Sequence, residues 1–172
     1  MSTPTIHTIG KSRKIVIDQS IYEIERGKAF FVSDEIVQAA GVNNYTFIYP
    51  KDTTKKYHIS FKFSSYPQSG VWLYEGTGSA TTGSGTALTS YCLNRNEATG
   101  SLIVVKDITT GSSGTGSQIF RAYIPDWTVD TFGAPDTRLG EMIIKDATPY
   151  LLRFSGSATG RIGVGIFWYE TS

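Results

Sequence analysis

Residues 57–63, YHISFKF, alternate strictly between apolar and polar side chains, and this pattern decides the fold class. The odd positions carry Tyr, Ile, Phe and Phe, whereas the even positions carry His, Ser and Lys. A two-residue period is typical of a β-strand that buries one face and exposes the other. The segment is therefore predicted to be a half-buried strand.

Similar short runs, rich in β-branched and aromatic residues, recur along the whole chain. They predict strands at residues 14–18, 29–33, 45–49, 71–75, 86–93, 102–108, 118–124, 141–145, 150–155 and 161–170. Helical periodicity is confined to one place. A short helix is expected at residues 34–40, because Ser33 can cap its start and Gly41 can end it.

Gly-, Ser- and Thr-rich segments separate these strands and predict exposed loops at residues 76–85, 111–117 and 155–160. Many short strands with regularly spaced turns favour an all-β fold, an antiparallel β-sandwich that is jelly-roll-like, with a barrel as the alternative. Residues 14–172 are predicted to form this single domain. Residues 1–13 show little periodicity and are predicted to be an extended N-terminal arm.

Composition excludes several classes of protein. The chain has 172 residues and a formal net charge of +1, so no strong field draws it to nucleic acid or to an anionic membrane, and neither partner is expected. Cys92 is the only cysteine, which excludes an internal disulfide and a cysteine-based zinc cluster. No stretch has the roughly 18 apolar residues of a membrane helix, and residues 1–10 lack a secretory signal, so folding in a cytoplasm is expected.

Two motifs could carry catalysis. His7 and His58 are the only histidines, and His58 lies on the polar phase of its strand, where a triad would also need a nucleophile and an orienting acid. The Gly-Thr-Gly that begins at Gly76 follows a strand, but no helix pattern comes after it to supply the dipole of a phosphate site. Both are interpreted as surface features.

Acidic residues leave two further alternatives open. Asp126, Asp130 and Asp136 could share a calcium ion, but their spacing matches no calcium-binding loop, so solvated turn residues are the favoured interpretation.

Glu75, Glu141 and Glu170 lie at predicted strand positions and could form a glycosidase-type pair, since the separation of two carboxyl groups is invisible in a sequence. Solvated strand ends are again the favoured interpretation. No catalytic residue, metal or cofactor is therefore predicted, and Cys92 is interpreted as a small apolar residue.

Two unbroken apolar runs, at residues 71–74 and 166–169, place apolar side chains on both faces of their strands. In a two-layer sandwich the second face must be covered by a loop, an arm or another subunit. Trp72 and Trp168 are accordingly candidate partner-binding residues. The arm adds further candidates of basic and apolar type, and these are Ile6, Ile9, Lys11, Arg13 and Lys14.

Residues 71–96, VWLYEGTGSATTGSGTALTSYCLNRN, contain a strand that ends in Tyr-Glu-Gly, a Gly/Ser/Thr loop, then Gly-Thr-Ala-Leu-Thr and Leu-Asn-Arg. This segment, with YLLRF at 150–154 and FWYE at 167–170, resembles small structural proteins of tailed-bacteriophage heads, the decoration or cement proteins. The resemblance spans about residues 27–170, although residues 126–140 and Cys92 depart from the pattern. It implies a β-sandwich bound outside an icosahedral shell of major capsid protein, often as a homotrimer.

Three functions follow as hypotheses. A capsid decoration protein on the virion surface is favoured by the resemblance and by the lack of an active-site motif. A receptor- or carbohydrate-binding module of a tail fibre or tail tip is the alternative, because jelly rolls also serve as lectins. A small glycan hydrolase would need two carboxylates that face each other across a cleft.

Overall fold

The computed structural model describes residues 23–24, 26–66, 68–76, 85–94, 100–108, 116–125, 129–132 and 141–172, the backbone alone for 129–132. The predicted arm at 1–13 and the predicted strand at 14–18 lie outside the described residues. No helix in the described ranges is long and apolar enough to cross a membrane.

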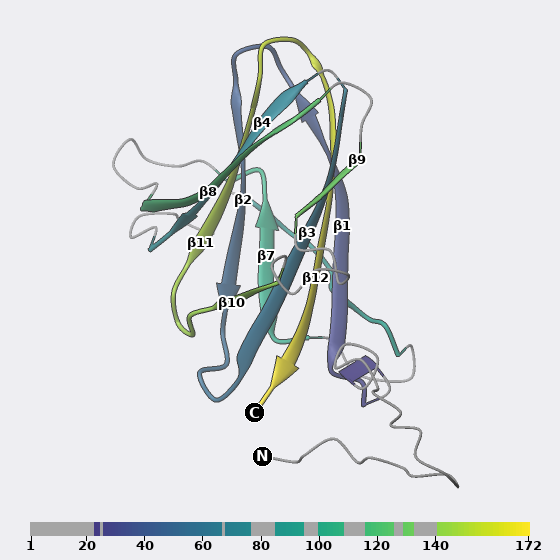
Figure 1. Ribbon diagram of the computed structural model, residues 1–172, viewed down its shortest axis with the longest axis vertical. Coiled ribbons are helices and arrows are strands. Elements are labelled where there is room, and N and C mark those ends of the chain that lie inside the picture. The colour runs from purple at the N-terminus through teal and green to yellow at the C-terminus, as the bar shows by residue number, and fades with distance from the viewer. Residues whose placement is uncertain are drawn as a thin grey trace, which may run out of the picture.

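Within these described ranges, twelve strands form two antiparallel sheets (Figure 1). Their bounds are β1 Ala29–Gln38, β2 Asn43–Pro50, β3 Lys56–Tyr66, β4 Ser69–Glu75, β5 Thr86–Ala87, β6 Tyr91–Cys92, β7 Leu102–Lys106, β8 Ser117–Ile124, β9 Val129–Phe132, β10 Met142–Ile144, β11 Tyr150–Gly156 and β12 Gly160–Thr171. Sheet A has the order β10-β3-β12-β1-β6, with β9 also paired to β3. Sheet B has the order β5-β7-β2-β11-β4-β8.

The core lies between the two sheets and confirms the predicted all-β sandwich. The odd residues of β3 point into it, and Tyr57, Ile59, Phe61 and Phe63 are at most 2% exposed. Sheet B contributes alternate residues of β2, β4 and β11 to the same cluster, for example Leu152 at 0%. Each such side chain contributes about 1.5–3 kcal/mol by leaving water, so the alternation read in the sequence becomes the main stabilising layer.

The helix predicted at residues 34–40 is wrong, because β1 continues without interruption to Gln38. Ile36 is 3% exposed on the inner face and Val37 is 69% exposed on the outer face, which is the two-residue period of a strand. Pairing with β12 along the whole of β1 supplies backbone hydrogen bonds that local helix signals cannot match. Gly41 does end the segment, with φ of 69° in the turn before β2.

Two other regions differ from the predicted strands. The single strand predicted at residues 86–93 is two short strands, because β5 pairs with β7 in sheet B whereas β6 pairs with β1 in sheet A. Residues 129–132, interpreted as turn, form β9 on the edge of β3. Of the loop predicted at residues 155–160, only 157–159 form an exposed turn, because β11 continues to Gly156 and β12 begins at Gly160.

Candidate functional site

The buried carboxylate Glu170 is the most completely satisfied charged group among the described residues. It is 3% exposed, and Lys55 Nζ lies 2.6 Å from Oε2. Its Oε1 accepts hydrogen bonds from Ser101 N at 2.8 Å, Ser101 Oγ at 3.0 Å and Trp168 Nε1 at 3.2 Å. The interpretation of Glu170 as a solvated strand end is therefore wrong: its neighbours satisfy it within the fold, and it serves to tie β12 to two loops.

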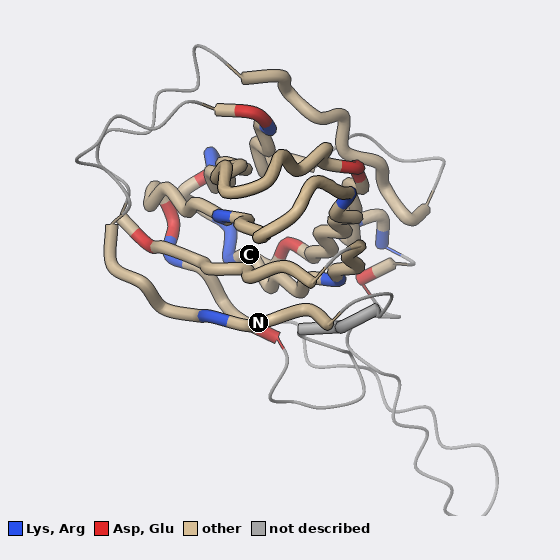
Figure 2. The backbone as a smooth tube through the Cα atoms, turned by 90° about the horizontal axis from the view of Figure 1, so that it is seen from above, with Lys and Arg blue, Asp and Glu red and all other residues tan. Residues whose placement is uncertain are grey.

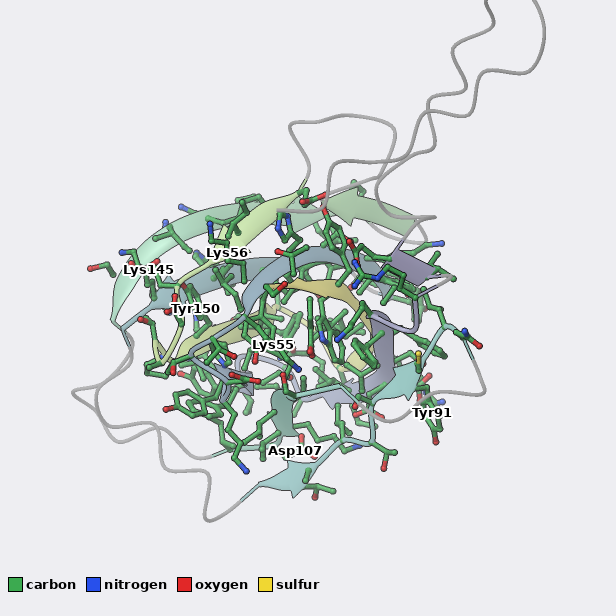
Figure 3. The ribbon with its side chains drawn as sticks, turned by 90° about the horizontal axis from the view of Figure 1, so that it is seen from below. Lys55, Lys56, Tyr91, Asp107, Lys145 and Tyr150 are labelled. Atoms are coloured by element: carbon green, nitrogen blue, oxygen red, sulfur yellow. The ribbon has the colours of Figure 1, made fainter. Side chains whose placement is uncertain are left out.

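Glu75 belongs to a different network at the end of sheet B, where Lys145 and Tyr150 lie close together (Figure 3). Lys145 Nζ lies 2.5 Å from Oε1, and Tyr150 donates to Oε2 at 3.0 Å. The hydrogen bond from Lys145, followed by that from Tyr150, lowers the pKa of Glu75, and burial raises the pKa of Tyr150. Both pKa shifts favour an ionised Glu75 and a neutral Tyr150, and these are the forms that make the hydrogen bond between them.

Glu141 lies on the outer face of sheet A and completes an acid–imidazole–hydroxyl sequence. It contacts His58 Nδ1 and accepts a hydrogen bond from Tyr169 at 2.6 Å, while His58 stacks on Tyr169 with ring centroids 4.4 Å apart. The hydroxyl of Thr171 lies 3.4 Å from His58 Nε2. The distance between Thr171 and His58 exceeds that between a nucleophile and the base that activates it. We therefore assign no catalysis to Glu141, His58 and Thr171.

Glu75, Glu141 and Glu170 thus occupy three separate networks. Glu170 points inward from sheet A, Glu141 lies on the outer side of that sheet, and Glu75 is in sheet B. Because they lie on different faces and in different sheets, these three glutamates do not form the facing pair of carboxylates that a glycosidase needs.

The predicted calcium ligands fall mostly outside the described residues. Asp126 and Asp136 lie there, and Asp130 is seen only as the backbone partner of Phe63 in β9. Within the described part of the chain, no group of three or more His, Cys, Asp or Glu residues is placed to hold a metal ion. Cys92 is a free, buried thiol at 5% exposure, in agreement with its interpretation as a small apolar residue.

An aromatic row crosses the outer face of sheet A. Tyr91 of β6 pairs with Phe31 of β1, and Phe31 pairs with Phe167 of β12. The ring centroids are 5.7 Å and 6.1 Å apart. Tyr91 is 44% exposed and projects from the rim of the sandwich (Figure 3), and Phe167 is 36% exposed. We call these three residues the aromatic row.

The outer face of sheet B carries a second apolar cluster, and this one is covered. Phe47, Tyr74, Val105 and Leu151 are between 0% and 7% exposed, and Ile108, beyond the end of β7, packs with them. Trp72 lies beside the cluster and is half-buried. Of the two outward residues in 71–74, Tyr74 is therefore covered as expected, in a cluster that includes Ile108 from outside the strands, whereas Trp72 is only half-buried.

The predicted partner-binding residues have different outcomes. Ile6, Ile9, Lys11, Arg13 and Lys14 lie outside the described residues. Trp72 does face outward. Trp168 is 2% exposed and stacks on Phe30 at 5.6 Å inside the core, where it cannot touch a partner.

Phe167 is the most exposed residue of the run at 166–169. It was not among the predicted partner-binding residues. Phe31 and Tyr91 were also missed. The run predicted that one phase would face outward, but only the strand register identifies the residues beside it.

Basic and acidic residues are interspersed along the described backbone (Figure 2). No family model matches the chain, and neither a curated protein nor a solved structure matches it.

Proposed function

We propose that this chain is a structural virion protein, a decoration or cement protein that binds the outside of a phage head and stabilises the shell. The observation that carries the proposal is the aromatic row of Tyr91, Phe31 and Phe167. Large aromatic side chains left exposed side by side are typical of interface centres, where Tyr, Trp and Arg supply most of the binding energy.

The strand order supports the jelly-roll part of the proposal. Eight of the strands form two four-stranded arrays. Their order is β1-β12-β3-β9 in sheet A and β2-β11-β4-β8 in sheet B. Two interleaved Greek keys give this order, which is the jelly roll of many capsid and lectin domains. Short strands β5, β6, β7 and β10 are additions at the edges. Fold alone does not specify function, so the aromatic row remains the stronger support.

The proposed partner of the row is the major capsid protein shell, and the proposed solution state is a homotrimer. A cement protein gains from symmetry, because many copies turn a modest interface into large total stabilisation. A flat apolar face suits that task better than a cleft, since it can lie across the joint between two shell subunits.

The test uses particles stripped of the native protein and measures occupancy after the purified protein is added back. The double variant Tyr91→Ala/Phe167→Ala should bind at least about 30-fold more weakly, the loss expected for one interface hot spot of about 2 kcal/mol. The matched control is Ile103→Ala/Ile119→Ala, which removes two side chains that are 36% and 43% exposed on sheet B. Equal saturation by wild type and the aromatic-row variant would overturn the proposal.

Three further measurements address the other parts of the proposal. Deletion of residues 1–12 should weaken occupancy if the arm contacts the shell, whereas unchanged occupancy would remove the arm from the proposal.

Light scattering should report a trimer, and a monomer both at micromolar concentration and on the particle would contradict it. Labelled protein found at the tail rather than on the head would favour the receptor-binding alternative.

A further inference from the structure

A ladder of arginine and aromatic side chains crosses the outer face of sheet B. Arg153 of β11 pairs with Trp72 of β4, and Trp72 pairs with Arg121 of β8. The Arg153 guanidinium carbon lies 4.1 Å from the Trp72 ring centroid, and that of Arg121 lies 5.5 Å from it. Arg121 also lies 4.8 Å from the ring of Tyr123. We call Arg153, Trp72, Arg121 and Tyr123 the arginine ladder.

The ladder is held in place by the fold. Gly70 leaves the space in which the Trp72 ring lies, because a Cβ there would come within 2.3 Å of that ring. Tyr123 meets Trp72 edge-on with centroids 6.3 Å apart, and the Arg121 guanidinium donates to the Tyr123 hydroxyl. Stacked guanidinium groups lose little conformational freedom when they bind a ligand, so the ladder is preorganised.

Neither arginine has an acidic partner in the described part of the chain. Arg161 on sheet A pairs with Glu35 at 2.7 Å, but no carboxylate among the described residues forms an ion pair with Arg121 or Arg153. The Nε of Arg153 is buried without a hydrogen-bond partner. Two positive charges therefore lie together on a face where no described carboxylate supplies a counter-charge, which is the complement of an anionic ligand.

We propose that the arginine ladder binds an acidic polysaccharide, through carboxylates on the guanidinium groups and sugar rings against Tyr123. The two arginines stand on strands two apart, so they are separated by roughly 10 Å, which suits charges repeated along a polymer. Tyr123 is 53% exposed and offers an amphipathic ring beside them. Nucleic acid is disfavoured, because its affinity depends on many phosphate contacts and the chain has a net charge of only +1.

The experiment is titration of the full-length protein with polygalacturonate, followed by calorimetry, with neutral dextran as the uncharged control. We expect salt-sensitive binding to polygalacturonate and none to dextran. Arg121→Gln and Tyr123→Ala should each weaken binding at least about tenfold with an unchanged melting temperature. Arg161→Gln is the matched control on the other sheet and should bind as wild type does.

Several outcomes would overturn the proposal. These are no binding to polygalacturonate, equal loss in Arg121→Gln and Arg161→Gln, or binding of poly-glutamate or single-stranded DNA as tight as that of the polysaccharide. The last result would assign the ladder to acidic peptides or to nucleic acid. Because the particle assay tests the aromatic row of sheet A and its control lies outside the arginine ladder, failure here leaves the proposed decoration function standing. Failure of the particle assay likewise leaves this site standing.

Discussion

The outer faces of the two sheets differ in how they treat apolar side chains. On sheet B, Leu151 is 0% exposed and Phe47 is 5% exposed, because a second cluster that includes Ile108 covers them. On sheet A, Phe167 and Tyr91 keep 36% and 44% of their surface in water. Apolar residues on the outer faces therefore form a second small core on sheet B, whereas on sheet A they stay exposed, where we propose that a partner binds.

The difference follows from what lies beside each strand. On sheet A, Gly163 and Gly165 precede Phe167 on the same face of β12 and add no side chain that could bury its ring. On sheet B the neighbours across β2, β11 and β4 are Phe47, Leu151 and Tyr74, which cover one another in a single row. A row of large side chains buries the outer face of a sheet, whereas glycines leave the neighbouring ring exposed.

Matched leucine substitutions give the largest expected effect. Leu151→Ala on sheet B should destabilise the fold by about 3 kcal/mol, since a fully buried leucine leaves a cavity when it is truncated. Leu93→Ala, beside β6 at the edge of sheet A, should cost less than about 1 kcal/mol because Leu93 is 37% exposed. Urea denaturation of both variants measures the difference, and equal losses would mean that the second cluster is no core.

Two glycines under aromatic rings give an intermediate effect. A Cβ at Gly70 would lie 2.3 Å from the Trp72 ring, whereas one at Gly165 would lie 3.1 Å from the Phe167 ring. Gly70→Ala should therefore cost about 1–2 kcal/mol, because Arg153 holds Trp72 in place and the strain exceeds the gain from a stiffer unfolded chain. Gly165→Ala should stay within about 0.5 kcal/mol of wild type. Thermal melts in which Gly165→Ala is the worse variant would reverse the comparison of the two faces.

The sequence predicted the sandwich and most of its strands because one buried face imposes a two-residue period, as at residues 57–63. It failed at residues 34–40, where Ser33 and Gly41 gave local helix signals and pairing with β12 prevailed. It also missed β9, because a short edge strand among turn residues carries little periodicity.

The candidate site was less predictable than the fold. The apolar run at 166–169 correctly indicated an outward phase, but Trp168 was chosen and Phe167 is the exposed ring. Which phase faces inward depends on the whole register of β12 with β1 and β3. The arginine ladder joins residues from positions 72, 121 and 153, and no local pattern links strands so distant in sequence.

The smallest effect on stability is expected for two ion pairs, one from each sheet. The pKa of Glu75 is lowered chiefly by its hydrogen bond from Lys145. The ionised form is thus favoured in the folded state, so this pair's contribution is fully present above the ordinary value of 4.5 and is lost as the pH falls through the lower folded-state pKa.

Glu75→Gln should therefore remove part of the acid-side fall in stability, with a loss of no more than about 1 kcal/mol at neutral pH because the pair is partly open to solvent. Glu35→Gln on the outer face of sheet A is the control. Its pair with Arg161 is 53% and 69% exposed, so solvent screens it and the acid limb should keep the wild-type slope. Urea denaturation from pH 7 to pH 3 checks both variants. A flatter acid limb in Glu35→Gln than in Glu75→Gln would show that the exposed pair of sheet A, rather than the end of sheet B, carries the pH dependence.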